Sequence, residues 1–317
     1  MSTIDTKPTA AATPTLKPAT LTPSDRQRKA KSLASTGKLV RTSVLHLFLA
    51  GATFTMAVPF VWMVLTSMSL PEEVGRENWI PALLRSGDWN MIKEHVFDNY
   101  KQVFKEIEFG RFYCNSIFIA SWVTFLQVFT SSLAAFAFSR LKWPGRDRIF
   151  LMYLSTMMLP GLVMMIPNFQ IMIKLGWIDT FAGLIIPSSF SAFGTFLLRQ
   201  FMLTIPSSLD EAAEIDGASK WQVYWNVILP LSRPGLITLT IFTFMGSYMS
   251  FFWPLVMLKS VHRYTLPIGL LFFDSTQGQS THLLMAAVAM SIVPMIVVFV
   301  LLQKRLVKGI QLGAVKG

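Results

Sequence analysis

Long runs of apolar residues recur along this chain and are separated by short polar segments. A helix that spans a membrane needs roughly 20 consecutive, mostly apolar residues. Six runs approach or exceed that length, and the fourth is the shortest. They cover about Val44–Met68, Phe112–Phe138, Ile149–Ile173, Phe181–Leu198, Leu236–Leu258 and Leu283–Leu302. The pattern predicts an all-α integral membrane protein with six transmembrane helices.

Composition and charge agree with a membrane protein and indicate its orientation. Hydrophobic residues make up 52% of the chain and charged residues 14%, whereas soluble domains carry about 25% charged residues. With the amino terminus inside, the inner segments hold 19 Lys and Arg residues and the outer loops hold 9. Because positive residues favour the cytoplasmic side, both termini are expected in the cytoplasm. The net charge of +11 mostly reflects this bias and does not indicate nucleic-acid binding.

The first 42 residues differ from the rest of the chain. Thr, Ala, Pro and Lys dominate up to Pro23, and a basic cluster follows. Such a segment cannot bury enough apolar surface to build a core. Residues 1–42 are therefore predicted to form a disordered cytoplasmic tail, with its basic cluster near anionic lipid headgroups. Residues 43–317 are predicted to form one transmembrane domain.

A polar, strongly patterned segment at about 206–230 lies between the fourth and fifth apolar runs. Ser208 and Glu211 have the spacing of a capping box, which starts a helix. Gly217 is suited to end that helix, because glycine adopts the left-handed backbone conformation at little cost. A first short helix is therefore predicted before Gly217.

A second helix is predicted after this glycine. Ser219 and Gln222 repeat the capping spacing, aromatic and apolar residues recur at helical intervals, and Pro230 is expected to end the helix. Two short helices that meet at a glycine form a bent, rigid unit. Such a unit suits a loop that another protein grips.

This segment resembles the EAA loop of permease subunits in binding-protein-dependent ABC importers. The matching residues are Glu211, Ala212, Ala213, Gly217, Leu229 and Pro230, with Val227 where isoleucine is usual. Short patterns in the same order over about 220 residues resemble the second permease of carbohydrate importers of the maltose type. They include Asn99-Tyr100, Leu133–Arg140, Tyr264–Pro267, Leu283–Ala287 and Gly313–Gly317.

The resemblance implies a multi-pass subunit of the bacterial inner membrane with several partners. It would form a heterodimer with a second permease, above two ATPase subunits that bind ATP and Mg. An extracytoplasmic binding protein would deliver the solute. Glu211 would pair with a basic residue in the ATPase groove, or it would only complete the capping box with Ser208. Ala212 and Ala213 would allow close approach, and Gly217 would set the bend.

The resemblance assigns roles to two further segments. The tail would run along the ATPase interface, although a frayed end is the alternative; it consists of Gly313, Ala314, Val315, Lys316 and Gly317. The outer stretch at 274–281 would contact the binding protein through Asp274, Gln277 and Gln279. The alternative for that stretch is a plain solvated loop.

Polar and aromatic residues within or at the ends of the apolar runs are candidates for the substrate path. They are Asn115, Asn168, Tyr248 and Trp253. Sugars favour aromatic faces and amide hydrogen bonds, but such residues also join helices to each other. Pro160, Gly161 and Pro167 interrupt the third run. A broken helix there would gate the path, and a simple kink is the alternative.

Missing motifs exclude several other functions. The sequence contains no phosphate-binding loop motif, so ATP hydrolysis is expected in a separate chain. Its four histidines lack metal-ligand spacing, and no catalytic residues or cofactor are predicted. The six apolar runs contain no Asp, Glu, Lys or Arg, which argues against an ion-coupled carrier and against a membrane enzyme. The sequence does not separate a sugar, oligosaccharide or polyol from a glycerol phosphate or another non-sugar solute.

Overall fold

The computed structural model describes residues 23–73, 80–88, 90, 96–277 and 280–314. Within these ranges the chain is helical and contains no strand. The longer helices are α1 (Pro23–Ser67), α4 (Asp98–Glu106), α5 (Phe109–Arg140), α6 (Arg146–Ser155), α7 (Gly161–Leu175), α9 (Ala192–Leu203), α13 (Arg233–Tyr248), α15 (Leu266–Gln277) and α16 (Thr281–Ala314). This confirms the all-α class.

Shorter elements connect these helices. They are η1 (Pro71–Glu73), α2 (Ala82–Arg85), η2 (Thr156–Met158), α8 (Ala182–Ser188), α10 (Ser208–Ile215), α11 (Lys220–Gln222), the π-helical turn η3 (Val223–Ile228), α12 (Leu229–Leu231), α14 (Phe252–Met257) and η4 (Val261–Arg263). The chain divides into two compact units, Met1–Phe60 and Val61–Gly317. The second unit holds every element discussed below except the greater part of α1.

Four stretches of the described chain are long and apolar enough to cross a membrane. They are Arg41–Ser67, Phe109–Arg140, Ala182–Leu203 and Thr281–Gln303. Two further candidates are bent pairs of helices, so the number of spans is four to six. One pair joins Arg146–Met158 to Gly161–Leu175 at 99°, and the other joins Lys220–Leu231 to Arg233–Tyr248 at 75°.

The first helix begins earlier than the sequence pattern predicts. Residues 23–42 are helical as part of α1, where a disordered tail was expected, and residues 1–22 of that tail lie outside the described residues. The stretch after Pro23 is rich in Arg, Lys, Ala and Leu, which favour helix, and it has no proline until Pro59. The helix of the first span can therefore extend toward the amino terminus beyond the apolar run.

The third and fifth predicted spans are each interrupted. The third breaks between Met158 and Gly161, at the place that Pro160 and Gly161 indicate. An interruption at Pro167 is wrong, because α7 continues through that residue. The fifth, expected over Leu236–Leu258, ends as α13 at Tyr248, and the chain resumes as the short helix α14. The break in the third run is therefore confirmed, and its gating role stays a prediction.

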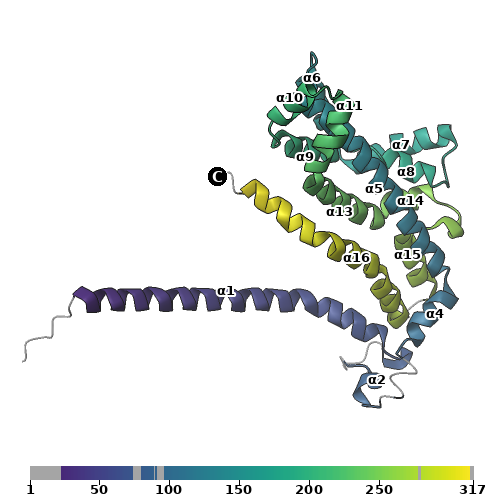
Figure 1. The fold of residues 1–317 in the computed structure, drawn as a ribbon. Helices are drawn as coiled ribbons and strands as arrows, with labels where there is room; N and C mark the ends of the chain where they lie inside the picture. The colour runs from purple at the N-terminus through teal and green to yellow at the C-terminus, as the bar shows by residue number, and fades with distance from the viewer. Residues whose placement is uncertain (1–22, 74–79, 89, 91–95, 278–279, 315–317) are drawn as a thin grey trace, which may run out of the picture. The chain divides into compact units, whose positions relative to one another are not determined.

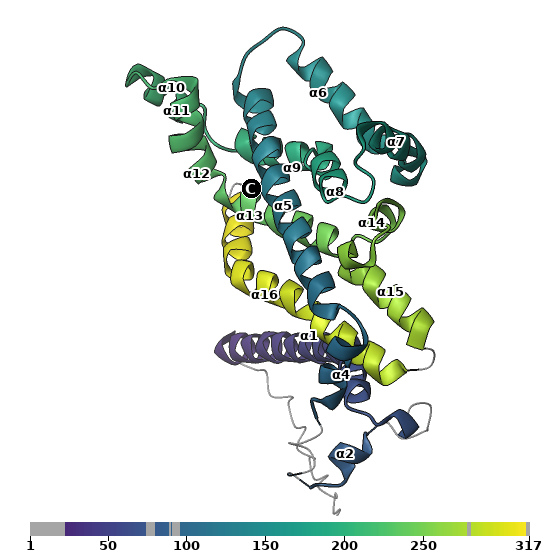
Figure 2. The same ribbon diagram turned by 90° about the vertical axis from the view of Figure 1, so that its right-hand side faces the viewer.

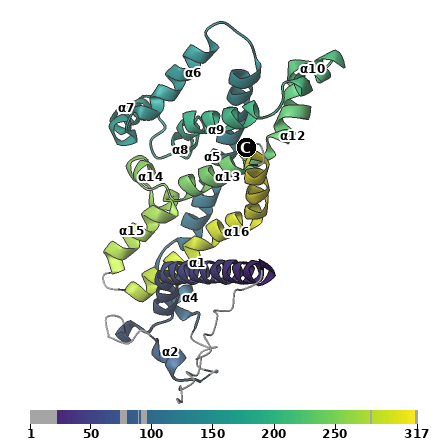
Figure 3. The same cartoon turned by 90° about the vertical axis from the view of Figure 1, so that its left-hand side faces the viewer.

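Helix α5 is the centre of the second unit and contributes to three apolar clusters. Its first turns, with Phe109 and Phe112, pack with α4, α13, α15 and α16. Its middle, with Val123, packs with α7, α8, α14 and α15. Its last turns, with Ala135 and Phe136, pack with α9, α13 and η3. Figure 1, Figure 2 and Figure 3 show α10–α12 near one end of α5 and α4 and α15 near the other.

Helix α9 can pack closely against α5 and α13 because it has a glycine at the point of contact. A Cβ added to Gly194 of α9 would lie 2.6 Å from the Ser131 side chain of α5 and 3.2 Å from Leu239 of α13. A larger residue there would push the three helices apart. The end of α5 is thereby held against α9 and α13, close to the polar segment at 206–230.

Candidate functional site

The polar segment at 206–230, called the coupling segment below, contains the bent pair of helices that the sequence predicts. Helix α10 ends at Ile215, and Gly217 follows with φ +84°. The Gly217 amide donates to the Glu214 oxygen at 3.0 Å, and the Ala218 amide donates to the Ala213 oxygen at 2.9 Å. These two bonds form a Schellman motif, which requires the left-handed residue. Gly217 therefore ends the helix as predicted.

The second capping box is present, and the first is not. The Ser219 hydroxyl accepts from the Gln222 amide, and the Gln222 side chain accepts from the Ser219 amide. By contrast, α10 begins at Ser208 itself, and its cap residue Ser207 makes no side-chain bond. The capping box predicted for Ser208 and Glu211 is therefore wrong. Ser208 already lies inside the helix, where its hydroxyl cannot act as a cap.

Three buried side chains attach the second helix to the membrane spans. Val223, Tyr224 and Ile228 of η3 are at most 1% exposed and pack against α5 and α9. The hydroxyl groups of Tyr224 and Ser132 lie 2.7 Å apart. Since Ser132 donates to the Phe129 oxygen, it accepts from Tyr224. The helix also continues through Pro230 to Leu231 and ends one residue later than expected.

The other side of the coupling segment is exposed and partly apolar. Ile215 is 86% exposed and Trp221 is 57% exposed. The side chains of Glu211 and Ala212 are exposed, and Ala213 is half-buried. An exposed apolar surface on a polar loop is typical of a protein-binding site. Leu229 and Pro230 are half-buried and lie where the segment joins α13.

Arg140 holds the start of the coupling segment to the membrane spans. Its guanidinium donates to the oxygens of Met202 and Ile205 at 2.7 and 2.8 Å and lies 3.1 Å from the Asp210 carboxylate. Burial raises the pKa of Asp210, and the Arg140 charge opposes that shift. Sequence reasoning missed this pair because its partners are 70 positions apart. An arginine at the end of an apolar run was its only signal.

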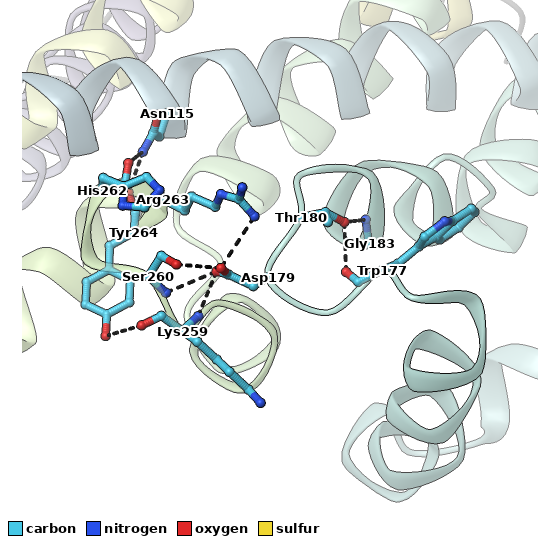
Figure 4. Close-up of polar contacts among 10 residues, drawn as sticks. All are labelled: Asn115, Trp177, Asp179, Thr180, Gly183, Lys259, Ser260, His262, Arg263 and Tyr264. Carbon is cyan, nitrogen blue, oxygen red and sulfur yellow. Dashed lines mark hydrogen bonds and ion pairs between the residues drawn. The ribbon is translucent and has the colours of Figure 1, made fainter.

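Two polar side chains, Asp179 and Asn115, fix the loop between α14 and α15 at the opposite end of α5 (Figure 4). The Asp179 carboxylate accepts from the amides of Lys259 and Ser260 at 3.0 and 3.1 Å and from the Ser260 hydroxyl at 2.5 Å. It also lies 3.4 Å from Arg263. Burial would raise the pKa of Asp179, but these bonds, together with the Arg263 charge, lower it to about 2.

Asn115 of α5 holds the same loop from the other side. Its amide group donates to the oxygens of His262 and Tyr264 at 3.1 and 3.0 Å. In this structure Asn115 therefore joins elements of the fold. Asp179 has φ +58°, a conformation that Asp adopts more readily than most residues. No local sequence pattern indicated its partners, which lie about 80 positions away.

The structure brings together two of the four candidate residues for the substrate path. Asn168 and Trp253 line one cavity of about 590 Å³, together with Gly161, Leu162, Met165, Pro187, Ser188, Ser250, Phe251 and Phe252. The Trp253 indole donates to the Gly183 oxygen at 3.2 Å, which fixes the ring. Tyr248 is buried, and its hydroxyl donates to the Ser291 oxygen at 2.9 Å. Neither Tyr248 nor Asn115 lines this cavity.

The remaining candidates fall partly outside the described residues. Asp274 and Gln277 belong to helix α15, so the outer stretch is helical up to Gln277, whereas Gln279 lies outside the described residues. Gly313 and Ala314 end helix α16, and Val315, Lys316 and Gly317 lie outside the described residues. The contacts of both segments with partners stay predictions. Among the described residues no cluster of His, Cys, Asp or Glu could hold a metal ion.

Comparison with known proteins supplies relatives for this architecture. Residues 127–312, more than half of the chain, match the family described as binding-protein-dependent transport system inner membrane component. The arabinooligosaccharides transport system permease protein AraQ of Halalkalibacterium halodurans is 34% identical over 70% of this chain and 80% of its own length. The sn-glycerol-3-phosphate transport system permease protein UgpE of Brucella abortus is 32% identical over 84% of this chain and 94% of its own length.

A solved structure has the same fold. It is the crystal structure of a bacterial ABC transporter involved in the import of the acidic polysaccharide alginate, and one of its chains is 25% identical with a TM-score of 0.69. The match covers 90% of this chain and 99% of that chain. The relatives are transport components and not enzymes. The family match, the helical spans and the bent coupling segment together show that this chain belongs to the inner membrane components of binding-protein-dependent transport systems, the permease subunits of ABC importers.

Proposed function

We propose that this chain is the membrane-spanning subunit of an ATP-driven importer that translocates a carbohydrate. It pairs with a second permease, and two ATPase subunits bind beneath them in the cytoplasm. A binding protein on the outer side delivers the sugar, oligosaccharide or polyol. Both termini lie in the cytoplasm, as the distribution of Lys and Arg indicates.

The coupling segment is the observation that carries this proposal. It presents a rigid bend with exposed apolar and acidic side chains, and its buried side attaches to α5 and α9. An ATPase that grips the exposed side can therefore move the ends of two spans. Since ATP binds only one state of the ATPase dimer tightly, it shifts the permease toward the matching state. In that state the path opens outward to the binding protein.

The cavity with Asn168 and Trp253 supports a neutral carbohydrate as the substrate. Three aromatic side chains and an amide line it, and sugars bind to such surfaces. A glycerol phosphate would need Arg, Lys or several backbone amides around its phosphate. None of the residues that line this cavity is charged. A glycerol phosphate is therefore the second candidate, and the name of the UgpE relative is its main support.

Purification of the tagged chain from its native membranes tests the assembly. In mild detergent we expect a nucleotide-binding ATPase and a second permease to accompany it, identified by mass spectrometry. Recovery of the chain alone after crosslinking would contradict the importer. The intact complex, reconstituted with its binding protein, should then accumulate a labelled carbohydrate only when ATP is inside the vesicle.

Substitution of Trp253 tests the substrate path. Trp253→Ala should lower carbohydrate uptake by about tenfold or more, because burying a large apolar side chain contributes about 1.5–3 kcal/mol and every 1.4 kcal/mol is about tenfold in affinity. Trp122→Ala is the matched control, since Trp122 is an exposed tryptophan of α5 that does not line the cavity. Equal uptake by both variants and the unchanged protein would remove Trp253 from the path.

A further inference from the structure

A single arginine connects two membrane spans to the coupling helix α10. Arg140 is the last residue of α5, and its guanidinium donates to the oxygens of Met202 and Ile205 at the end of α9. The same group forms an ion pair of 3.1 Å with Asp210 in the first turn of α10. The ends of three helices therefore meet on one side chain.

This ion pair differs from the surface pairs of the chain. The Arg140 side chain is 9% exposed and the Asp210 side chain is 14% exposed. Surface pairs contribute little, because water and salt screen them. Separating a largely buried pair instead leaves the Asp210 carboxylate without its charged partner, which is unfavourable. The pair can therefore resist a displacement of α10 relative to α5.

Side-chain packing alone does not hold α10 to the spans. No residue of α10 is buried, and only Ala213 packs partly against the nearby apolar cluster. A cavity of about 710 Å³ lies between α10 and the loop that joins α5 to α6, and both Arg140 and Asp210 line it. Among the described residues, Arg140 and Asp210 form the one ion pair that joins α10 to α5 or α9.

We propose that Arg140 is a positioning residue of the transport cycle, which makes α10 move as one body with the ends of α5 and α9 through Asp210. This inference rests on the proposed function, because it requires an ATPase that moves α10. In this view the Arg140 side chain carries the displacement from the coupling segment into the spans. The buried residues of η3 anchor only the second half of the segment.

The first test compares ATP hydrolysis with uptake in the complete reconstituted importer. Asp210→Asn removes the charge and keeps the shape of the side chain. We expect the rate of ATP hydrolysis to stay within about twofold of that of the unchanged protein. Uptake per ATP hydrolysed should fall by about tenfold, which lies within the usual range of coupling between two sites. Asp147→Asn is the matched control, because Asp147 pairs with Arg146 and Arg199 at an exposed surface outside the coupling segment. That variant should keep the normal ratio.

Two outcomes would overturn the inference. One is a normal ratio of uptake to hydrolysis in Asp210→Asn. The other is a parallel loss of ATP hydrolysis and uptake in a complex that is fully assembled, because a merely structural role predicts it. If the Asp210→Asn complex does not assemble, the same measurement is made on the Arg140→Lys variant. Lysine keeps the charge but cannot reach the Met202 oxygen, the Ile205 oxygen and the Asp210 carboxylate at once. If the Arg140→Lys complex assembles, a lowered ratio of uptake to ATP hydrolysis supports the inference, and a normal ratio refutes it.

Spin labels measure the joint movement directly. Labels replace Leu209 on α10 and Phe129 on α5, both exposed, in a Cys114→Ser background. When the Arg140–Asp210 ion pair is intact, the distance between the labels should be equal in the nucleotide-free and the ATP-trapped importer. A shift between these states would show that α10 moves independently and would overturn the inference. Absence of ATP-driven uptake in the unchanged importer would instead reject the proposed function.

Discussion

Replacement of Gly217 tests whether transport needs the bend in the coupling segment. Gly217 has φ +84°, and an added Cβ would meet no atom within 4 Å. The penalty for a larger residue is therefore backbone strain alone, about 1–2 kcal/mol in the left-handed region. The two hydrogen bonds that depend on this bend contribute about 0.5–1.5 kcal/mol each. Strain of this size therefore competes with the bonds that keep the segment bent.

A graded series of variants separates strain from size. Asn adopts the left-handed conformation more readily than Ala or Val. ATP-driven uptake should therefore fall in the order Gly, Asn, Ala and Val at position 217. A strain of 1–2 kcal/mol changes the population of the bent form by about 5–30-fold. Uptake by Gly217→Val in proteoliposomes should fall by about that factor at equal amounts of inserted complex.

The control uses a glycine in an ordinary helical conformation. Gly51 also has no atom near the position of an added Cβ, and its φ is not positive, so Gly51→Ala should leave uptake unchanged. Hydrogen exchange at the amides of Gly217 and Ala218 should become faster in the impaired variants. Normal uptake by Gly217→Val, or equal loss in Gly217→Asn and Gly217→Ala, would refute the argument from strain.

Three further predictions concern stability, measured by thermal unfolding in detergent. Asp179→Asn should lower the free energy of unfolding by about 1–2 kcal/mol at neutral pH, because the carboxylate with its lowered pKa stabilises the folded state. The pKa shift alone would give a larger value, and solvent screening reduces it. The contribution of this carboxylate is full above its ordinary pKa of 3.8 and is lost as the pH falls through about 2; a full difference from the variant that persists below pH 2 would contradict it. Tyr224→Phe removes the bond to Ser132 and should cost about 1 kcal/mol, whereas an unchanged midpoint would show that the bond contributes nothing. Gly269→Ala would place a Cβ 2.2 Å from Phe112 and should cost about 1–3 kcal/mol by overpacking; equal or higher stability would mean that the aromatic ring moves aside freely.

The parts of the coupling segment that local chemistry determines could be predicted from the sequence. Gly217 ends α10 because few other residues adopt its backbone conformation, and Ser219 caps α11 because its partner Gln222 lies one turn away. The capping box predicted for Ser208 and Glu211 is absent for an equally local reason. Its neighbour Ser207 already has a helical backbone, with φ −66° and ψ −21°, so the helix starts before the serine that was expected to cap it.

Contacts between distant residues could not be predicted in this way. Arg140 and Asp210 are 70 positions apart, and Asp179 and Ser260 are 81 apart. Neither pair follows a periodic pattern, because the packing of α5 against α9 and of α8 against α14 brings the partners together. The candidates for the substrate path were polar residues in apolar runs. That criterion does not distinguish a residue that lines a cavity, such as Trp253, from one that joins elements of the fold.

The π-helical turn at Val223–Ile228 gives the coupling segment one residue more than a regular helix needs there. A wide turn holds one residue more than an α-helical turn over the same part of the chain. Deleting one exposed residue of this turn would restore the narrow turn, and the helix after it would keep its orientation toward α5 and α9. Inserting a residue into the following helix would instead rotate everything after it by about 100°. The coupling segment should therefore tolerate the loss of one residue at this turn better than the gain of one.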